Sequence, residues 1–152
     1  MRLEYPIDKL RAIFTVDEGG GLLRRGQPCG FLAQGYLWAK IGETRFAAHR
    51  IIFAIEYGWW PENVDHANGI KTDNRPSNLR AATHAQNMQN RGPLKAKTKG
   101  VYWQPRRGKW YAYTRIGGKQ KNLGSFDTEA AAAAAYAAAA AMFHGEFART
   151  CK

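Results

Sequence analysis

The sequence predicts an α+β fold built from two small modules, and three observations support this prediction. Short apolar runs separated by turn residues fill most of the first half, and one helix-like segment lies among them. In the second half, three strand-like runs precede an alanine-rich segment. A length of 152 residues suffices for one ordinary domain or two small ones. We place the modules at residues 1–91 and 100–152, joined by a basic linker at residues 92–99.

Hairpins are expected at the start of the first module. Residues 10–16 are apolar enough for a strand or a short helix, and the glycines at 19–21 then supply a turn into residues 22–25. Residues 35–46 fit two short strands around a turn at Gly42.

One core helix is expected in the first module. Residues 49–57 supply several large apolar side chains, and Gly58 stands where a left-handed cap is favoured. The following segment, residues 64–91, is too polar to predict a core element. Within it, Thr83 and Gln86 have the spacing of a capping box, which predicts a short helix from residue 84 to about residue 91.

The second module is expected to begin with an antiparallel sheet. Residues 92–100 open with two helix breakers and then alternate lysine with small residues, as a linker does. The strand-like runs that follow are Val101–Arg106, Lys109–Ile116 and Lys119–Phe126. Tight turns at residues 107–108 and 117–118 connect them, so we expect a three-stranded meander.

A helix is expected to cover one face of this sheet. Asp127 or Thr128 serves as its N-cap, Glu129 lies in its positive first turn, and Gly145 marks its end. Its many alanines favour a helix and let it lie close to the strands. Strand alternation places Trp110, Ala112, Thr114 and Ile116 on the face toward the helix, and Lys109, Tyr111, Tyr113 and Arg115 on the opposite face.

The positive charge is concentrated in the second half. Residues 1–90 hold eleven Lys/Arg against nine Asp/Glu, a net of +2, whereas residues 91–152 hold twelve against three, a net of +9. A polyanionic partner follows, because cations that neutralise phosphates release condensed counterions. DNA, RNA and an anionic membrane all qualify on charge alone. Interleaved tyrosines and tryptophans favour nucleic acid over lipid.

Several protein classes are excluded by composition. Cys29 and Cys151 are too few for a disulfide framework and match no metal-ligand spacing. The first residues lack the basic start and apolar core of a signal peptide, and no apolar stretch predicts a membrane span. We therefore expect a cytoplasmic protein.

The chemistry-bearing motif is an Asp65-His66 pair, with Asn78 twelve residues after the histidine and Asn87 nine residues later. Together with the flanking runs at residues 35–37, 49–53, 73–80 and 86–91, it resembles the HNH endonuclease family, in the branch common among phage and intron-encoded homing enzymes. The resemblance covers about the first 90 residues. It implies a ββα-metal finger and a metal-dependent DNA endonuclease of a bacterial or phage-infected host cell.

The resemblance also implies a role for each motif residue. His66 is the general base that takes a proton from water, which suits an imidazole at physiological pH. Asp65 and Asn87 hold the metal, and their oxygen donors suit Mg²⁺ or Mn²⁺. Asn78 braces the loop and so orients the histidine. The family usually has histidine at the position of Asn87, so its replacement lowers the affinity for softer metals such as zinc.

The remaining histidines carry weaker expectations. His84 begins a helix and could contact a phosphate there, and a solvated surface histidine is an equal alternative. His49 lies on an apolar helix and is expected to be structural. His144, at the end of the last helix, is assigned no function.

Residues 99–145 resemble the ethylene-response-factor type of DNA-binding domain, through residues 99–101, 108–112 and 123–128 and the alanine helix with Tyr136. The resemblance implies that the exposed face of the sheet lies in the major groove of DNA. Including the linker, the residues expected to contact DNA are Arg91, Lys95, Lys97, Lys99, Tyr102, Gln104, Arg106, Lys109, Tyr111, Tyr113, Arg115, Gln120 and Asn122. The outer strands differ from those of the plant members, so base specificity cannot be transferred.

Two other functions compete with the endonuclease. One is a non-catalytic DNA-binding or regulatory protein that kept the nuclease scaffold. The other is a basic RNA-binding protein, which the lack of an RNA-recognition motif disfavours. We expect double-stranded DNA as the partner rather than a membrane, no small-molecule cofactor, and a monomer.

Overall fold

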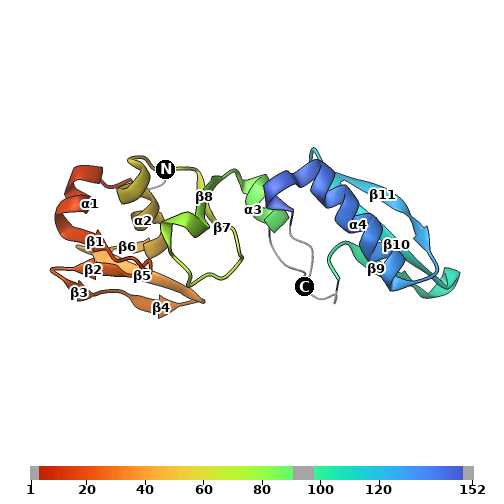
Figure 1. The fold of residues 1–152 in the computed structure, drawn as a ribbon, viewed down its shortest axis with the longest axis horizontal. Helices are drawn as coiled ribbons and strands as arrows, with labels where there is room; N and C mark the ends of the chain where they lie inside the picture. The colour runs from red at the N-terminus through yellow and green to blue at the C-terminus, as the bar shows by residue number, and fades with distance from the viewer. Residues whose placement is uncertain (1–3, 91–97, 149–152) are drawn as a thin grey trace. The chain divides into compact units, whose positions relative to one another are not determined.

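The computed structural model describes residues 4–90 and 98–148, and its chain divides into two compact units, residues 1–84 and 85–152 (Figure 1). The division falls at the start of helix α3 (His84–Asn90), whereas the sequence places the module boundary after this helix. Most of the expected linker, with Arg91, Lys95 and Lys97, lies outside the described residues, as does Cys151.

The first unit opens with a helix and a small three-stranded sheet. Helix α1 (Ile7–Ile13) continues directly into β1 (Phe14–Val16), so residues 10–16 contain both elements that the sequence allows. Strand β1 pairs antiparallel with β2 (Leu22–Arg24), which confirms the first hairpin, and β2 pairs with the short β3 (Gln27–Pro28).

A second three-stranded sheet leads into the central helix. Strands β5 (Tyr36–Ile41) and β6 (Thr44–Ala47) form the expected hairpin, and β4 (Phe31–Ala33), which the sequence analysis did not identify, pairs with the other edge of β5. Helix α2 (Ala48–Tyr57) follows β6 immediately. It ends at Gly58, whose φ of +78° is the left-handed conformation that glycine adopts without strain.

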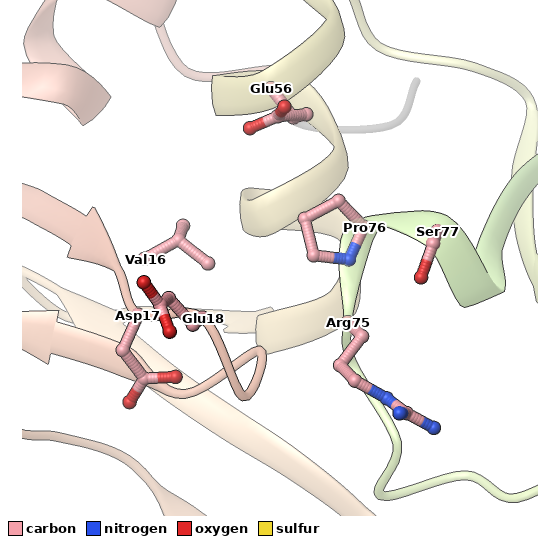
Figure 2. Close-up of a pocket in the computed structure, with 7 residues that line it drawn as sticks. All are labelled: Val16, Asp17, Glu18, Glu56, Arg75, Pro76 and Ser77. Carbon is pink, nitrogen blue, oxygen red and sulfur yellow. The ribbon is translucent and has the colours of Figure 1, made fainter.

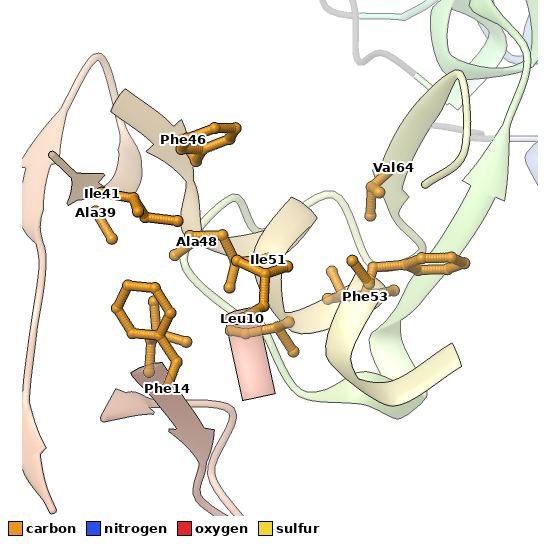
Figure 3. Packing of buried hydrophobic residues seen from close by; sticks show 13 residues of the cluster. Leu10, Phe14, Ala39, Ile41, Phe46, Ala48, Ile51, Phe53 and Val64 are labelled. Carbon is orange, nitrogen blue, oxygen red and sulfur yellow. The ribbon is translucent and has the colours of Figure 1, made fainter. Parts of the chain in front are cut away.

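The core of the first unit surrounds α2. Ile51 and Ile52 are completely buried, and they pack in one cluster with Leu10 of α1, Phe14 of β1 and Phe46 of β6 (Figure 3). Burying side chains of this size contributes about 1.5–3 kcal/mol each. Helix α2 is therefore packed against α1, β1 and β6. This packing holds the residues on its first turn in place.

The segment after α2 corrects one expectation. Residues 63–82, which looked too polar for a core element, contain β7 (Asn63–His66) and β8 (Leu79–Ala82), paired antiparallel and linked by a loop with a short helical turn η1 (Pro76–Asn78). Val64 and Leu79 each place one apolar side chain in the core cluster. The buried Asp65 of β7 is paired with Arg80 of β8, so this charge has a partner where the strands pack on the core. Helix α3 follows, as the capping box predicts.

The second unit confirms the predicted meander. Its strands are β9 (Val101–Gln104), β10 (Lys109–Ile116) and β11 (Lys119–Phe126), with β10 in the centre. Strand β9 is two residues shorter than expected. The proline at 105 lacks the N–H that a strand ladder needs, and the chain forms a helical turn, η2 (Pro105–Arg107), instead.

Helix α4 (Glu129–His144) packs on this sheet and leads into a short turn, η3 (Gly145–Phe147). Of the two candidate N-caps, Thr128 is the one used: its hydroxyl accepts a hydrogen bond from the Ala131 N–H at 3.1 Å. The stripe Ala132, Tyr136 and Ala140 is buried against the sheet.

The sorting of β10 side chains is confirmed at its centre, where Ala112 and Thr114 are buried and Tyr111 and Tyr113 are more exposed. No helix in the described ranges, 4–90 and 98–148, is both long and apolar enough to cross a membrane.

Candidate active site

Strand β7 brings the two central motif residues side by side. Asp65 and His66 are each only 5% exposed. In the register with β8, Asp65 lies opposite Arg80 and His66 lies opposite Leu79. Because successive side chains of a strand point to opposite faces, the carboxylate and the imidazole have different surroundings.

His66 is oriented by a hydrogen bond from its own loop. Its Nε2 lies 3.0 Å from Oδ1 of Asn74. An amide oxygen accepts, so in this contact the imidazole is the donor, through Nε2. Asn74 is itself buried, at 3% exposed. The sequence assigned the orienting role to Asn78 and missed Asn74.

Two aromatic rings complete the surroundings of His66. The ring of His49, on the first turn of α2, meets that of His66 edge to face with centroids 5.0 Å apart. Tyr36 is the first residue of β5, and its ring lies near both imidazoles. The centroid of its ring is 5.3 Å from that of His49 and 6.1 Å from that of His66. The structure thus joins three chain segments at one point. His49 and Tyr36 belong to runs that carried the family resemblance, which was the available signal for their importance.

His49 is held as a neutral ring. Burial lowers its pKa from 6.5 to about 3, and the nearby His66 and Arg50 act in the same direction. Its Nδ1 is buried and has no hydrogen-bond partner within the described part of the chain. A neutral imidazole against His66 adds no positive charge beside the candidate base.

Asp65 is paired with an arginine from the neighbouring strand. Its Oδ2 accepts hydrogen bonds from Arg80 Nε at 2.9 Å and from a terminal nitrogen of the same guanidinium at 2.8 Å. The Arg80 side chain is 16% exposed and that of Asp65 is 6% exposed. This is a charge-assisted pair removed from most of the solvent, and it fixes the direction of the carboxylate.

The loop between β7 and β8 is held by side-chain amides. Asn78 donates from Nδ2 to the Asp73 carbonyl at 2.7 Å and to Asn68 Oδ1 at 3.1 Å, and its Oδ1 accepts from the Asn68 N–H at 3.0 Å. Asp73 in turn accepts from Arg75, whose hydrogen bonds hold the pKa of the Asp73 carboxyl well below its usual range. This network fixes the loop that carries Asn74.

The expected metal ligands divide between the two units. Asp65 belongs to the first, and Asn87, half-buried on α3, belongs to the second, so their pairing stays a prediction. Within the described residues, no three His, Cys, Asp or Glu side chains gather as a metal site. The donor types nevertheless fit Mg²⁺, which proteins bind through one or two carboxylates while several waters remain on the ion. His84 is exposed, and a phosphate contact from it also stays a prediction.

The sheet of the second unit presents the expected polar and aromatic residues. Tyr102, Gln104, Arg106, Arg115, Gln120 and Asn122 are all exposed. Some expected contact residues have protein partners: Lys109 forms an ion pair with Asp127, and Lys99 donates to the carbonyl of Gln89. Tyr111 accepts a hydrogen bond from Arg107, a cation that the sequence analysis did not include.

An open pocket of about 450 Å³ lies elsewhere in the first unit (Figure 2). Its lining includes the carboxylates of Asp17, Glu18 and Glu56 and the single guanidinium of Arg75. An excess of carboxylates repels phosphates, and neither Asp65 nor His66 lines this pocket. We therefore place the candidate active site at His66.

Comparison with known proteins bears on the same segment. Residues 46–89 match the family model of the HNH endonuclease. The match covers less than a third of the chain and contains all four motif residues, Asp65, His66, Asn78 and Asn87. Searches of the curated proteins and of the solved structures found no match. The HNH segment, residues 46–89, supports a relation to nucleases and implies a nucleic-acid substrate. The resemblance of residues 99–145 to an ethylene-response-factor type domain stays a prediction.

Proposed function

We propose that this chain is a metal-dependent endonuclease that hydrolyses phosphodiester bonds of double-stranded DNA. The observation that carries the proposal is the buried His66 inside the HNH segment, with its Nε2 proton directed to Asn74. A histidine held in one tautomer has a defined nitrogen with which to accept a proton. That is the requirement for a general base.

His66 takes a proton from the attacking water on Nδ1 in this proposal. The oxygen of the water then forms a bond to phosphorus while the bond to the leaving oxygen of the sugar breaks. Asn74 retains the Nε2 proton and keeps the ring in place, and Asn78 fixes the loop behind it. The neutral ring of His49 packs against the base without competing for a proton at physiological pH.

Asp65 and Asn87 are the residues that would hold Mg²⁺ or Mn²⁺. A divalent cation bound there supplies positive charge for the leaving oxygen. A carboxylate has about four lone-pair positions, so the hydrogen bonds from Arg80 are compatible with a role as ligand. Arg80 would keep the Asp65 carboxylate correctly directed when the metal binds.

The second unit is proposed to hold the DNA. Its net positive charge and the exposed side chains on β9, β10 and β11 support this role. In this division of labour, the chain acts as a monomer in which His66, Asp65 and Asn87 act on the scissile bond and the sheet of the second unit binds the DNA.

A plasmid-nicking assay tests the proposal. Supercoiled DNA is incubated with the full-length chain in Mg²⁺, in Mn²⁺ and with a chelator, and His66→Ala is tested beside it. We expect relaxed or linear product only with metal, and a loss of about 10²- to 10⁴-fold in His66→Ala. DNA binding without metal-dependent cleavage would instead identify a non-catalytic DNA-binding protein.

A further inference from the structure

The loop that follows His66 carries a lysine to which the proposed reaction assigns no role. Lys71 is exposed, and its Nζ lies 4.5 Å from the centre of the Tyr36 ring. The same ring lies 6.1 Å from that of His66. The distance from the Lys71 ammonium to the centre of the His66 ring is therefore at most the sum of these two distances. Each strand of DNA carries one phosphate charge per roughly 3.4 Å of helix axis, so a phosphate near the one attacked at His66 can lie within reach of the ammonium.

The Lys71 side chain is restrained at its ammonium by the Tyr36 ring and along its stem by the turn at Gly35. The Tyr36 ring attracts the ammonium, an interaction of about 0.5–1 kcal/mol at an exposed site. The stem of the lysine lies along the turn between β4 and β5, where a Cβ built on Gly35 would be 3.5 Å from its Cδ. Its loop is closed by the bond from the Asp73 N–H to the Ile70 carbonyl at 3.1 Å. Lys71 is thus held over a ring that also touches the candidate base.

The charge of Lys71 is not neutralised by the protein. Within residues 4–90 and 98–148, no carboxylate forms an ion pair with it. Asp73, the acidic residue of the same loop, is already engaged by Arg75 and Asn68. An ammonium has three donors and acts as a point charge toward phosphate. A fixed cation without a counterion beside the candidate base is complementary to a DNA backbone.

We propose that Lys71 binds a phosphate of the cleaved strand at or next to the scissile bond, and that Tyr36 holds the ammonium in position. The inference rests on the proposed nuclease function and extends it by naming a substrate-binding residue outside the motif. Lys71 contacts a non-bridging phosphate oxygen, while His66 and the residues around it act on the water.

Steady-state cleavage and DNA binding by the full-length chain test this role, each over a series of salt concentrations. Lys71→Ala should lower kcat/KM by roughly 10- to 100-fold, the loss expected for one charged hydrogen bond. The slope of log affinity against log salt should become shallower by about 0.9, as for one lost phosphate contact. Lys71→Arg should stay within about threefold of the parent, since arginine also stacks on rings and binds phosphate.

Lys9→Ala is the matched control, because Lys9 is an exposed lysine of the same unit on α1. It should match the parent in both measurements. Equal losses in Lys9→Ala and Lys71→Ala, or an unchanged rate and slope in Lys71→Ala, would overturn the assignment. If the parent does not cleave DNA, the nuclease proposal fails, and the difference in binding slope alone decides the role of Lys71.

Discussion

The imidazoles of His49 and His66 meet edge to face with centroids 5.0 Å apart, although seventeen positions separate them in the chain. His66 ends a short strand and His49 lies on the first turn of the central helix, so the contact joins the candidate base to an element with many buried residues. Burial lowers the pKa of His49 to about 3, which keeps this ring neutral at physiological pH.

The neutrality of His49 predicts a pH-dependent stability. Its folded pKa, about 3, lies below the ordinary 6.5, so its contribution is complete above pH 6.5 and is lost as the pH falls toward 3. Each unit of pH in that window costs about 1.4 kcal/mol. Between pH 7.5 and pH 5, urea unfolding should show a loss about 2 kcal/mol larger in the parent than in His49→Phe.

The other titrating groups are present in both proteins. His66, Arg50 and Tyr36 face the ring in each, and the lowered pKa of Asp73 contributes its own acid sensitivity equally. The comparison therefore isolates the titration of His49 together with its coupling to His66. Identical pH profiles for the parent and His49→Phe would show that His49 is not the neutral buried group described.

The bond from His66 to Asn74 predicts a positioning effect. Asn74→Ala removes the acceptor that fixes the tautomer and ring angle, so kcat should fall by about 10²-fold with little change in KM, as for a misplaced catalytic group. Asn74→Asp keeps an acceptor oxygen at the same place and should recover part of the rate. A change confined to KM in Asn74→Ala would contradict a role in positioning.

The sequence suggested candidate catalytic residues but not the residues that hold them in place. Asp65 and His66 stood out because an acid, a base and two amides recur at a family spacing, which needs no knowledge of the fold. Asn74 and Arg80 did not, because their roles depend on a loop conformation and on strand register. The strands β7 and β8 were missed for a related reason. Their apolar pattern is weak, with Val64 and Leu79 in the core, and the pairing of Asp65 with Arg80 depends on the strand register.

The second unit followed local rules more closely. Its turns, strands and helix cap are set by glycines, alternation and Thr128, all of which are visible in the sequence. The exception was the end of β9, where the missing N–H of Pro105 outweighed the apolar alternation. What sequence reasoning could not give is the partner of each cation, such as the ion pair of Lys109 with Asp127.

The pair of Asp65 and Arg80 predicts an asymmetric response to mutation. Arg80→Ala leaves a buried carboxylate without this partner and should destabilise the protein by about 3–5 kcal/mol in urea unfolding. Adding Asp65→Asn to Arg80→Ala removes the uncompensated charge and should restore part of that loss. Additive effects of the two changes would mean that the ion pair is not a coupled unit.

Gly100 is predicted to be indispensable for the second unit. Its φ is +71°, and an added Cβ would lie 2.3 Å from the Tyr136 ring and 2.5 Å from the backbone oxygen of Tyr113. Gly108 has a similar φ of +57° but open space around it. Gly108→Ala should therefore cost only the left-handed strain of about 1–2 kcal/mol, and Gly100→Ala clearly more. Thermal unfolding of the two variants compares them directly; equal shifts would exclude the packing constraint.

The exposed cations of the second unit are predicted to account for most of the DNA affinity and little of the chemistry. Arg106, Arg107 and Arg115 are exposed, the first two on η2 and the third on the proposed DNA-facing side of β10. If each neutralises one phosphate, replacing all three by alanine should reduce the slope of log affinity against log salt by ~2.7. Affinity should fall steeply. The single-turnover cleavage rate at saturating protein should stay near that of the parent, because His66 and its partners are unchanged.

The matched control replaces the exposed Lys9, Arg25 and Lys40 of the first unit, which removes the same net charge. Binding titrations from low to physiological salt measure both triple variants. Equal slopes for the two would mean that DNA responds to total charge alone, and that the second unit is not the binding module.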